Sequence, residues 1–315
     1  MKRGSGTVRL QLPSTMSTTY FYDWQKKSDA PGRVTFKPGT GGLPKIEIET
    51  ACCSAEIYLQ GAHVTKFQKT GEESLLFMSE ASRFETGHPI RGGVPVIFPW
   101  FGPREGHDSH GFARNHTWEI WEITSLPNGG VRVQFRLPDC PELSAYPALH
   151  LNYSVTVGET LICELTVTNR SADRGLEFED CLHTYLRVSD ISRASIAGLG
   201  GGRFIDKVDG MAAKTQNVSV LKIGEETDRV YGDSPNSVEL IDESLRRKIR
   251  VDKSGGLSTV VWNPWVEKSK RLTDFGDDEY QRMVCIESGN IAQNRVSLPP
   301  GQSSALKLKL ISNAL

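Results

Sequence analysis

A histidine within a strand-like segment is the first candidate for proton transfer in this sequence. Residues 178–188 (FEDCLHTYLRV) alternate between apolar side chains and a polar face that carries Cys181, His183, Tyr185 and Arg187. Histidine is the side chain whose charge changes most readily near neutral pH. A sheet face of this composition is either exposed to solvent or the floor of a binding pocket, and the pattern alone leaves both interpretations open.

A glutamate at the end of a second apolar run is the matching candidate for a base. Residues 283–289 (MVCIESG) have the pattern of a buried strand, in which Glu287 shares its face with Cys285 and Met283. A buried carboxylate is costly unless it is paired with another group or used in a reaction. The alternative is a strand-end glutamate turned to solvent, so the pattern identifies Glu287 only as a candidate.

Arginines lie on two glycine-containing segments that interrupt the strand pattern. In residues 90–104 (IRGGVPVIFPWFGPR), the Gly-Gly pair permits close backbone approach, and three prolines fix the path of a loop that displays Arg91. In residues 110–118 (HGFARNHTW), His110 and Arg114 flank a Gly-Phe-Ala step, and neither side chain belongs in a dry core. Each segment alone is also compatible with an ordinary turn between strands.

The bulk composition restricts where a charged ligand could bind. Of the 315 residues, 38% are hydrophobic and 24% are charged, and the formal charge is −1. These values describe an ordinary globular protein with no overall preference for nucleic acid or membranes, so an anion site must be local. No apolar run approaches about 18 residues, and residues 1–19 lack the apolar core of a secretory signal, so we expect a cytoplasmic protein.

The cysteines are expected to be reduced core residues. Most of them lie in apolar strand patterns, and there is no C-x-x-C pair and no Cys/His cluster with the spacing of metal ligands. The sequence therefore predicts no metal site. The six residues are Cys52, Cys53, Cys140, Cys163, Cys181 and Cys285.

Short alternating segments recur along the chain and must position these candidates. Most are bounded by Gly, Pro, Asn or Asp, and helical periodicity is scarce beyond a short candidate at 279–283. The pattern predicts an all-β fold, a large antiparallel β-sandwich with few short helices. The predicted strands are 45–50, 55–59, 131–137, 151–157, 161–168, 181–188, 247–252, 258–262 and 305–311.

Residues 1–30 differ from the rest of the chain. Ser, Thr, Gly and Lys dominate this stretch and apolar periodicity is absent, so we expect a partly disordered N-terminal extension. Residues 31–315 are long enough for a single large β-sandwich domain. No repeat of about 20 to 50 residues points to a propeller or a solenoid.

Six motifs that occur in order resemble one known family. The sequence is similar to the hexose-6-phosphate mutarotases, also called glucose-6-phosphate 1-epimerases, a branch of the aldose 1-epimerase superfamily. The resemblance covers roughly residues 45–312 and implies a galactose mutarotase-like β-sandwich, a monomer or weak dimer, and catalysis without a metal or an organic cofactor. The motifs are RGGVPVIFPWFGP (91–103), HGFARNxTW (110–118), LHTY (182–185), TDRVY (227–231), WNPW (262–265) and CIESGN (285–290).

The resemblance also implies roles for individual residues. The catalytic histidine of the family falls on His183 and its catalytic glutamate on Glu287. The sugar and phosphate contacts of the family fall on Arg91, Arg114 and Asp228.

Two neighbouring positions concern sugar recognition. His110 matches the His-Gly histidine that touches the sugar in the wider superfamily. The residue before it, often a substrate-contacting glutamine in relatives, is Ser109 here. Its shorter hydroxyl changes the group that a sugar would meet, while the implied acid and base are retained.

The implied reaction requires one base and one acid, because a proton leaves the anomeric hydroxyl while another reaches the ring oxygen. Glutamate and histidine have pKa values of about 4.3 and 6.5 in water, so we expect Glu287 as the base and His183 as an imidazolium acid held by neighbouring acids. Arg91 and Arg114 would grip a phosphate through paired hydrogen bonds, with Lys268 as a weaker candidate. The expected substrate is a hexose 6-phosphate, and neither nucleic acid nor a membrane is expected as a partner.

Two other functions would use similar residues. A glycosidase needs two carboxylates that flank the scissile bond, whereas the pair here is a histidine with a glutamate, and Asp228 lies in a segment suited to holding hydroxyls. A non-catalytic carbohydrate-binding or regulatory protein needs sugar contacts but no matched acid and base. Trp262 and Trp265 do not discriminate, because indole rings either stack on sugars or fill a core.

Overall fold

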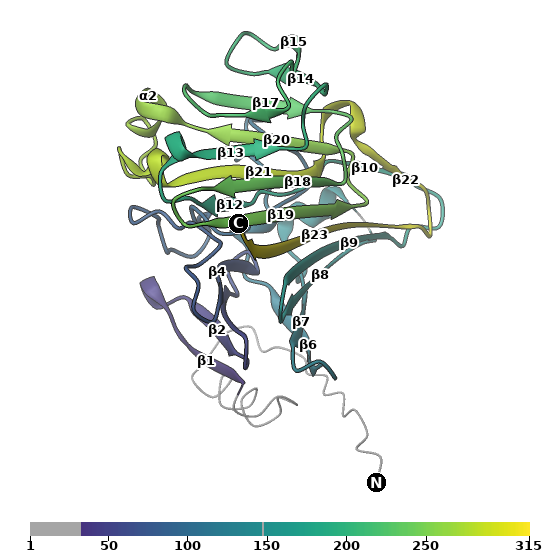
Figure 1. The fold of residues 1–315 in the computed structure, drawn as a ribbon. Coiled ribbons are helices and arrows are strands. Elements are labelled where there is room, and N and C mark those ends of the chain that lie inside the picture. The colour runs from purple at the N-terminus through teal and green to yellow at the C-terminus, as the bar shows by residue number, and fades with distance from the viewer. Residues whose placement is uncertain (1–32, 147) are drawn as a thin grey trace.

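Antiparallel strands are the main secondary structure in the computed structural model, which describes residues 33–146 and 148–315 (Figure 1). The prediction of an all-β protein with few short helices is confirmed. The N-terminal extension expected over residues 1–30 lies outside the described residues. The strands form two large sheets, a four-stranded sheet and a two-stranded ribbon.

The larger of the two main sheets has nine strands and curves from the upper to the lower part of the molecule in Figure 1. Its strands alternate buried and more exposed residues, as expected for a sheet with one face on the core. In sheet order they are β16 (Val220–Leu221), β13 (Ala194–Ala197), β18 (Ser237–Asp242), β19 (Arg247–Ser254), β23 (Ser303–Ala314), β9 (Leu161–Asn169), β8 (Leu149–Val157), β7 (Val131–Arg136) and β6 (Glu119–Ser125).

The second main sheet has eight strands and carries the candidate acid and base. Its central strands are buried on both faces, because one face packs on the main core and the other is covered by loops. In sheet order they are β15 (Ala212–Thr215), β14 (Arg203–Asp206), β17 (Thr227–Tyr231), β20 (Ser258–Asn263), β21 (Met283–Asn290), β11 (Asp180–Leu182) and β5 (Val96–Ile97), with β12 (Tyr185–Arg187) also paired with β21.

The remaining strands and the helices are short. The four-stranded sheet, at the lower left in Figure 1, contains β1 (Val34–Pro38), β2 (Pro44–Glu49), β3 (Cys53–Tyr58) and β4 (His63–Lys69). The ribbon pairs β10 (Leu176–Phe178) with β22 (Val296–Leu298). The helices are η1 (Thr40–Gly42), η2 (Ala113–Asn115), η3 (Pro141–Ala145), η4 (Ile191–Arg193), α2 (Trp265–Ser269), η5 (Glu279–Arg282) and η6 (Ala292–Asn294).

The predicted strands are confirmed, with one break. The run predicted over 181–188 is two strands, β11 and β12, which both pair with β21. Between them His183 and Thr184 lie outside the two strands: the amide of His183 donates to Pro95, while the carbonyl of Thr184 still accepts from Ile286 of β21. The helix expected at 279–283 is the 3-10 helix η5.

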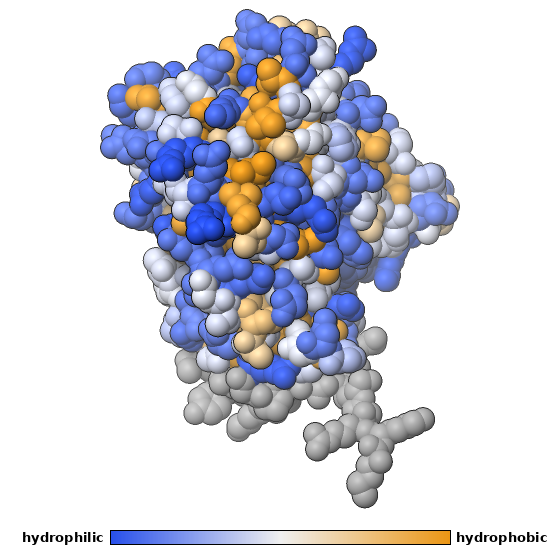
Figure 2. Space-filling view, in the orientation of Figure 1, coloured by the Kyte–Doolittle hydropathy of each residue, from blue (hydrophilic) through white to orange (hydrophobic). Residues whose placement is uncertain are grey.

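Hydrophilic residues cover most of the face shown in Figure 2, and hydrophobic residues form a narrow band on it. Among the described residues the exposed large hydrophobic side chains belong to Val208, Met211, Val218, Val220, Leu257 and Leu315. None of the helices that the structure describes is long and apolar enough to cross a membrane.

Candidate active site

One row of side chains crosses four strands of the eight-stranded sheet. Asp228 on β17 lies opposite Trp262 on β20, Trp262 opposite Cys285 on β21, and Cys285 opposite Tyr185 on β12. Because side chains two residues apart share a face, Glu287 on β21 lies on the same face as this row. On the predicted polar face of 178–188, Cys181, His183 and Tyr185 are therefore buried and only Arg187 is partly exposed.

His183 and Glu287 meet on this face. Nε2 of His183 lies 3.3 Å from Oε1 of Glu287, and the two residues are 7% and 1% exposed. The thiol of Cys181 donates to the other carboxyl oxygen of Glu287 at 3.6 Å. The ring of Tyr185 stacks on that of His183 with centroids 4.8 Å apart. Glu287 is thus not turned to solvent, and the imidazole is held flat against an aromatic ring.

Burial and neighbouring charge favour the neutral form of both members of this pair. The pKa of His183 lies well below 6.5 because of burial and then because of His110, Arg114 and Arg91. The pKa of Glu287 lies well above 4.5, first because of burial and then because of Asp228. The expectation that neighbouring acids hold His183 as an imidazolium is wrong for the free protein, since the charged groups that shift its pKa are cationic.

Arg91 is displayed by a tightly packed turn, as the Gly-Gly pair predicts. A Cβ atom at Gly93, where φ is +59°, would lie 2.2 Å from the carbonyl oxygen of Val64 and 2.8 Å from Nε2 of His63. A side chain therefore has no room there. Nε2 of His63 also lies 2.8 Å from the carbonyl oxygen of Gly92, which ties this turn to β4.

The guanidinium of Arg91 is anchored from two sides. Its Nη2 donates to both carboxylate oxygens of Asp274, at 3.0 and 3.1 Å, and its Nη1 donates to the Tyr185 hydroxyl at 3.0 Å. Burial alone lowers the pKa of Arg91, but Tyr185 and Asp274 raise it above its usual value. Its Nε is buried and has no hydrogen-bond partner among the described residues.

Arg114 is a second guanidinium near His183, and unlike that of Arg91 it is buried. It lies in η2, is 9% exposed, and its Nη2 donates to the carbonyl oxygen of Ser109 at 2.7 Å. Burial and the charge of Arg91 lower its pKa to about 10, which leaves it protonated at neutral pH. Its Nε is also buried without a partner in the part of the chain that the structure describes. Arg91 and Arg114 thus place two positive charges with unused Nε donors near His183, in a chain of nearly zero net charge.

His110 lies at the edge of the same group. Its ring centroid is 5.5 Å from that of His183, and its Nδ1 accepts a hydrogen bond from the Gly102 amide. Its backbone has φ of 66°, which a non-glycine residue adopts only under local strain. A Cβ atom at Gly111 would lie 2.0 Å from the carbonyl oxygen of Phe98, which explains the His-Gly order of this motif. The predicted motif therefore places a neutral imidazole, whose pKa burial and Arg114 lower well below 6.5, beside the pair.

Asp228 is held at the opposite side by lysines. Its Oδ2 lies 3.3 Å from Nζ of Lys207 and 3.9 Å from Nζ of Lys268, and Lys268 also contacts Glu226 at 3.1 Å. Lys268 is therefore engaged with two carboxylates, which disfavours its expected role in phosphate binding. Lys207 also lies over the Phe101 ring, with 5.4 Å between Nζ and the ring centroid.

Some residues of the site carried no usable signal in the sequence. Asp274 lies in an acidic loop, 274–278 (DFGDD), in which nothing distinguishes it from Asp277 or Asp278. Lys207 follows β14 and reaches the site only because β14 pairs with β17. Tyr185 was on the predicted polar face, but its contacts with both Arg91 and His183 depend on how the loop packs over the sheet.

Three side chains of types that can bind a metal ion also come together here, although the sequence predicts no metal site. One ligand atom from each of His183, Cys285 and Glu287 lies within 4.8 Å of the others. All three are buried. The two directly contacting members, His183 and Glu287, are also the ones with acid–base character, so this group can serve as a proton-transfer site without an ion.

Comparisons with known proteins identify the family. The family model described as aldose 1-epimerase matches residues 44–310. Two proteins named "Putative glucose-6-phosphate 1-epimerase" are similar: one from Cenchrus ciliaris is 34% identical, covering 83% of this chain and 82% of its own, and one from Escherichia coli K12 is 35% identical, covering 80% and 85%.

A solved structure agrees with these sequences. A "putative mutarotase" from Salmonella typhimurium superposes with a TM-score of 0.84 at 30% identity, covering 91% of this chain and 96% of its own. The expected mutarotase-like β-sandwich is therefore confirmed. The chain belongs to the aldose 1-epimerase family of isomerases.

Proposed function

We propose that this protein interconverts the α and β anomers of a hexose 6-phosphate, as a glucose-6-phosphate 1-epimerase. The observation that carries the proposal is the contact between His183 and Glu287, a buried acid–base pair 3.3 Å apart. Arg91 and Arg114 lie close enough to shift the pKa of His183, so an anionic group of the substrate would bind near the reacting end. The names of the two relatives support the choice of glucose 6-phosphate.

The reaction moves one proton at each of the two oxygens of the hemiacetal carbon, C1. The Glu287 carboxylate takes the proton from the anomeric hydroxyl while protonated His183 gives its proton to the ring oxygen, and the bond between C1 and that oxygen breaks. The resulting aldehyde rotates about the C1–C2 bond. Reclosure returns the proton of the new C5 hydroxyl to His183 and moves the Glu287 proton to the carbonyl oxygen, which becomes the anomeric hydroxyl of the other face.

Substrate charge converts the resting pair into the reactive pair. In the free protein, burial raises the pKa of Glu287, and burial together with the arginines lowers the pKa of His183, so the resting pair favours a protonated carboxyl group beside a neutral imidazole. A phosphate with nearly two negative charges offsets Arg91 and Arg114 and raises the pKa of His183. The proton then moves across the 3.3 Å contact, which leaves a carboxylate base and an imidazolium acid.

The phosphate would bind to Arg91 and Arg114 through charge-assisted hydrogen bonds. Each guanidinium keeps a buried Nε without a partner among the described residues, and an anion that accepts from these donors would relieve that cost. Asp274 and Tyr185 hold Arg91 in one orientation, so little side-chain entropy is lost on binding.

Asp228, His110 and Ser109 would contact the sugar. Asp228 is fixed by Lys207 and accepts hydroxyl hydrogens well as a carboxylate. His110 accepts the Gly102 amide at Nδ1, so its Nε2 carries the hydrogen and can donate to a sugar oxygen. Ser109 already uses its carbonyl oxygen for Arg114, and its hydroxyl supplies the shorter polar contact.

Magnetisation-exchange NMR of the anomeric protons tests the function directly. Glucose 6-phosphate, glucose and galactose are compared at equal concentration, and we expect enzyme-dependent exchange to be fastest for the phosphate ester. Binding without accelerated exchange would indicate a carbohydrate-binding protein, and release of reducing sugar from a glycoside would indicate a glycosidase. Either result would replace the proposed activity.

We further propose a monomer or weak dimer that acts in the cytoplasm. All six cysteines are free, which suits a reducing compartment. Sedimentation velocity over a range of protein concentrations tests the oligomeric state.

A further inference from the structure

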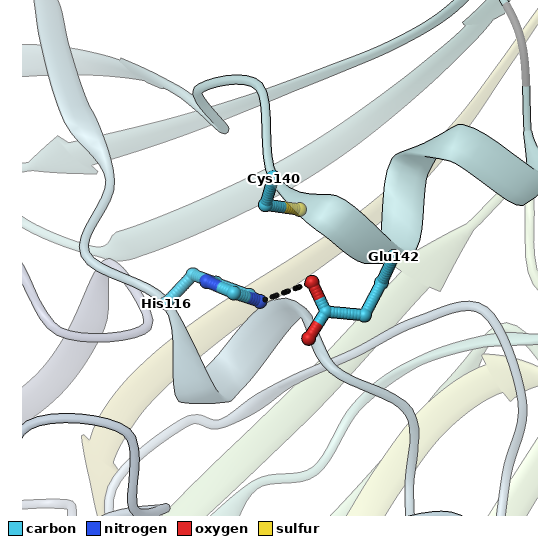
Figure 3. Close-up of side chains that lie close together, drawn as sticks. All are labelled: His116, Cys140 and Glu142. Carbon is cyan, nitrogen blue, oxygen red and sulfur yellow. Dashed lines mark ion pairs between the residues drawn. The ribbon is translucent and has the colours of Figure 1, made fainter.

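A second group of metal-ligand side chains lies apart from the candidate active site. Figure 3 shows His116, Cys140 and Glu142 converging, with the imidazole and the carboxylate pointing toward each other and the thiol beside them. His116 directly follows η2, whereas Cys140 precedes η3 and Glu142 lies in its first turn. We propose that these three side chains bind a Zn²⁺ ion, with water in the remaining coordination position.

The donor set matches the coordination preference of zinc. Imidazole nitrogen, thiolate sulfur and carboxylate oxygen are the three protein ligands that Zn²⁺ uses, whereas Mg²⁺ and Ca²⁺ require oxygen ligands. Three protein ligands with one open position form the usual arrangement of a site that retains a water molecule. The alternative is a surface cluster held by hydrogen bonds alone. Such a cluster would need only the contact between His116 and Glu142 and not the Cys140 thiol.

The distances are close to those of a tetrahedral site. Nε2 of His116 lies 3.2 Å from Oε2 of Glu142, and one ligand atom from each of the three side chains lies within 4.8 Å of the others. With zinc bonds of about 2.0 to 2.3 Å, ligand atoms in a tetrahedron are about 3.3 to 3.6 Å apart. Only small side-chain rotations are therefore needed to close the site around an ion.

The group is open to solvent, in contrast to the buried group at His183. The side chains of His116 and Glu142 are 26% and 45% exposed, and Cys140 is half-buried. Glu142 also lines a cavity of about 550 Å³ together with His107 and Asp108. The cavity gives solvent access to the Glu142 side of the group.

Binding would connect two segments that are separate in sequence. The ion would link the segment that follows Arg114 to η3, and thereby brace the loop that carries one of the proposed phosphate ligands. A ligand that binds only the folded state raises its stability in proportion to the logarithm of its concentration. The site would therefore support the fold near the active site without taking part in the reaction.

Cobalt spectroscopy on the full chain tests the proposal. Reduced protein that has been treated with a chelator and desalted is titrated with Co²⁺, a spectroscopic substitute for Zn²⁺. We expect a near-ultraviolet thiolate-to-cobalt charge-transfer band that saturates at one ion per chain and disappears when Zn²⁺ is added. Cys140→Ser should abolish the band, and His116→Asn and Glu142→Gln should each weaken Co²⁺ binding by at least about tenfold.

Two controls make the result decisive. Cys52→Ser removes another half-buried thiol far from the group in sequence and should leave the band unchanged. Cys285→Ser removes the thiol of the buried His183 group and should also leave it unchanged. A wild-type protein without the band, a band that survives in Cys140→Ser, or a band lost only in Cys285→Ser would overturn the proposal.

A stability measurement separates metal binding from misfolding. Zn²⁺ should raise the melting temperature of the wild type but not that of Cys140→Ser, while the anomer exchange rate of Cys140→Ser without metal equals that of the wild type. Loss of exchange in both proteins would concern the proposed function only, because the cobalt band does not depend on it. An equal rise in melting temperature for both proteins would contradict the site.

Discussion

Nε2 of His183 lies 3.3 Å from Oε1 of Glu287, although the two residues come from different segments of one sheet. β21 carries Glu287 in a regular ladder, whereas His183 lies in the break between β11 and β12, which both pair with β21. The interruption removes His183 from the regular strand geometry and allows its ring to stack on Tyr185. The contact is the basis of the proton transfer proposed above.

Substitutions of this pair should abolish most of the catalysed exchange. His183→Asn and Glu287→Gln keep the approximate shape but remove the transferable proton, so each should lower the exchange rate by at least about a hundredfold. NMR exchange with glucose 6-phosphate measures the loss. His150→Asn and Glu122→Gln, on the nine-stranded sheet, serve as matched controls. Near wild-type exchange in either site variant would contradict the assignment.

Glu287→Gln should also stabilise the protein, increasingly so as the pH rises. The pKa of Glu287 is raised in the folded state, so the folded protein retains a proton that the unfolded chain loses above about pH 4.3. Folding therefore takes up a proton, and the wild type loses stability as the pH rises toward the folded pKa, by at most about 1.4 kcal/mol per pH unit. Glutamine does not titrate, so it adds no such pH dependence to the stability of the variant.

Urea unfolding of both proteins between pH 5 and pH 8 measures this difference. We expect the advantage of Glu287→Gln to be larger at pH 8 than at pH 5. Glu279→Gln is the control, and it should destabilise the protein. The Glu279 carboxylate accepts hydrogen bonds from the amides of Glu80 and Gly276, and glutamine has one acceptor oxygen fewer. A constant difference across the pH range would show that Glu287 is ionised in the folded protein.

Removal of either arginine should reduce selectivity for the phosphate ester. Arg91→Ala or Arg114→Ala removes charge-assisted hydrogen bonds worth on the order of 1.5 to 3 kcal/mol, about ten- to hundredfold in affinity. Exchange of unphosphorylated glucose should not decrease in parallel, because the acid and the base remain and the loss of one cation favours the imidazolium form of His183. Arg104→Ala, an exposed arginine beside Trp100, is the control. Equal losses on both substrates would assign the arginines to structural support.

Tyr185→Phe should weaken phosphate binding without affecting the acid. The substitution removes the hydroxyl that accepts from Arg91 but keeps the ring that stacks on His183, and it changes no charge. Loss of one hydrogen bond of about 0.5 to 1.5 kcal/mol predicts a roughly two- to tenfold higher KM for glucose 6-phosphate at similar kcat. Tyr58→Phe, whose hydroxyl accepts the Thr40 amide, is the control and should not change KM. A fall in kcat alone would place the hydroxyl in the proton transfer.

Exhaustive chelation should leave the exchange rate unchanged. Proton transfer by Glu287 and His183 needs no Lewis acid, and the proposed zinc site at His116 lies outside the reacting groups. The activity of chelator-treated, desalted protein is compared with that of untreated protein. Loss of activity that one divalent ion restores would instead implicate the group formed by His183, Cys285 and Glu287.

The sequence by itself determined the architecture and named most of the candidate site residues. Period-two alternation identified the strands because each sheet buries one side chain in two. The Gly-Gly and His-Gly pairs marked the two arginine-bearing turns, since only glycine fits where a Cβ atom would overlap a neighbouring carbonyl. Six ordered motifs were sufficient to indicate the family, and the comparisons confirmed it.

Only the tertiary structure decided which charges face one another. Local pattern carries no information on long-range neighbours, so the cations around His183, the anchoring of Arg91 by Asp274 and the diversion of Lys268 to Glu226 and Asp228 were not predictable. The pKa values of His183 and Glu287 shift against the expected ionised pair for the same reason, because burial and nearby charge alter the intrinsic pKa of a side chain inside a protein. Likewise, His116 approaches Cys140 and Glu142 only when β6, β7 and the following loop have folded.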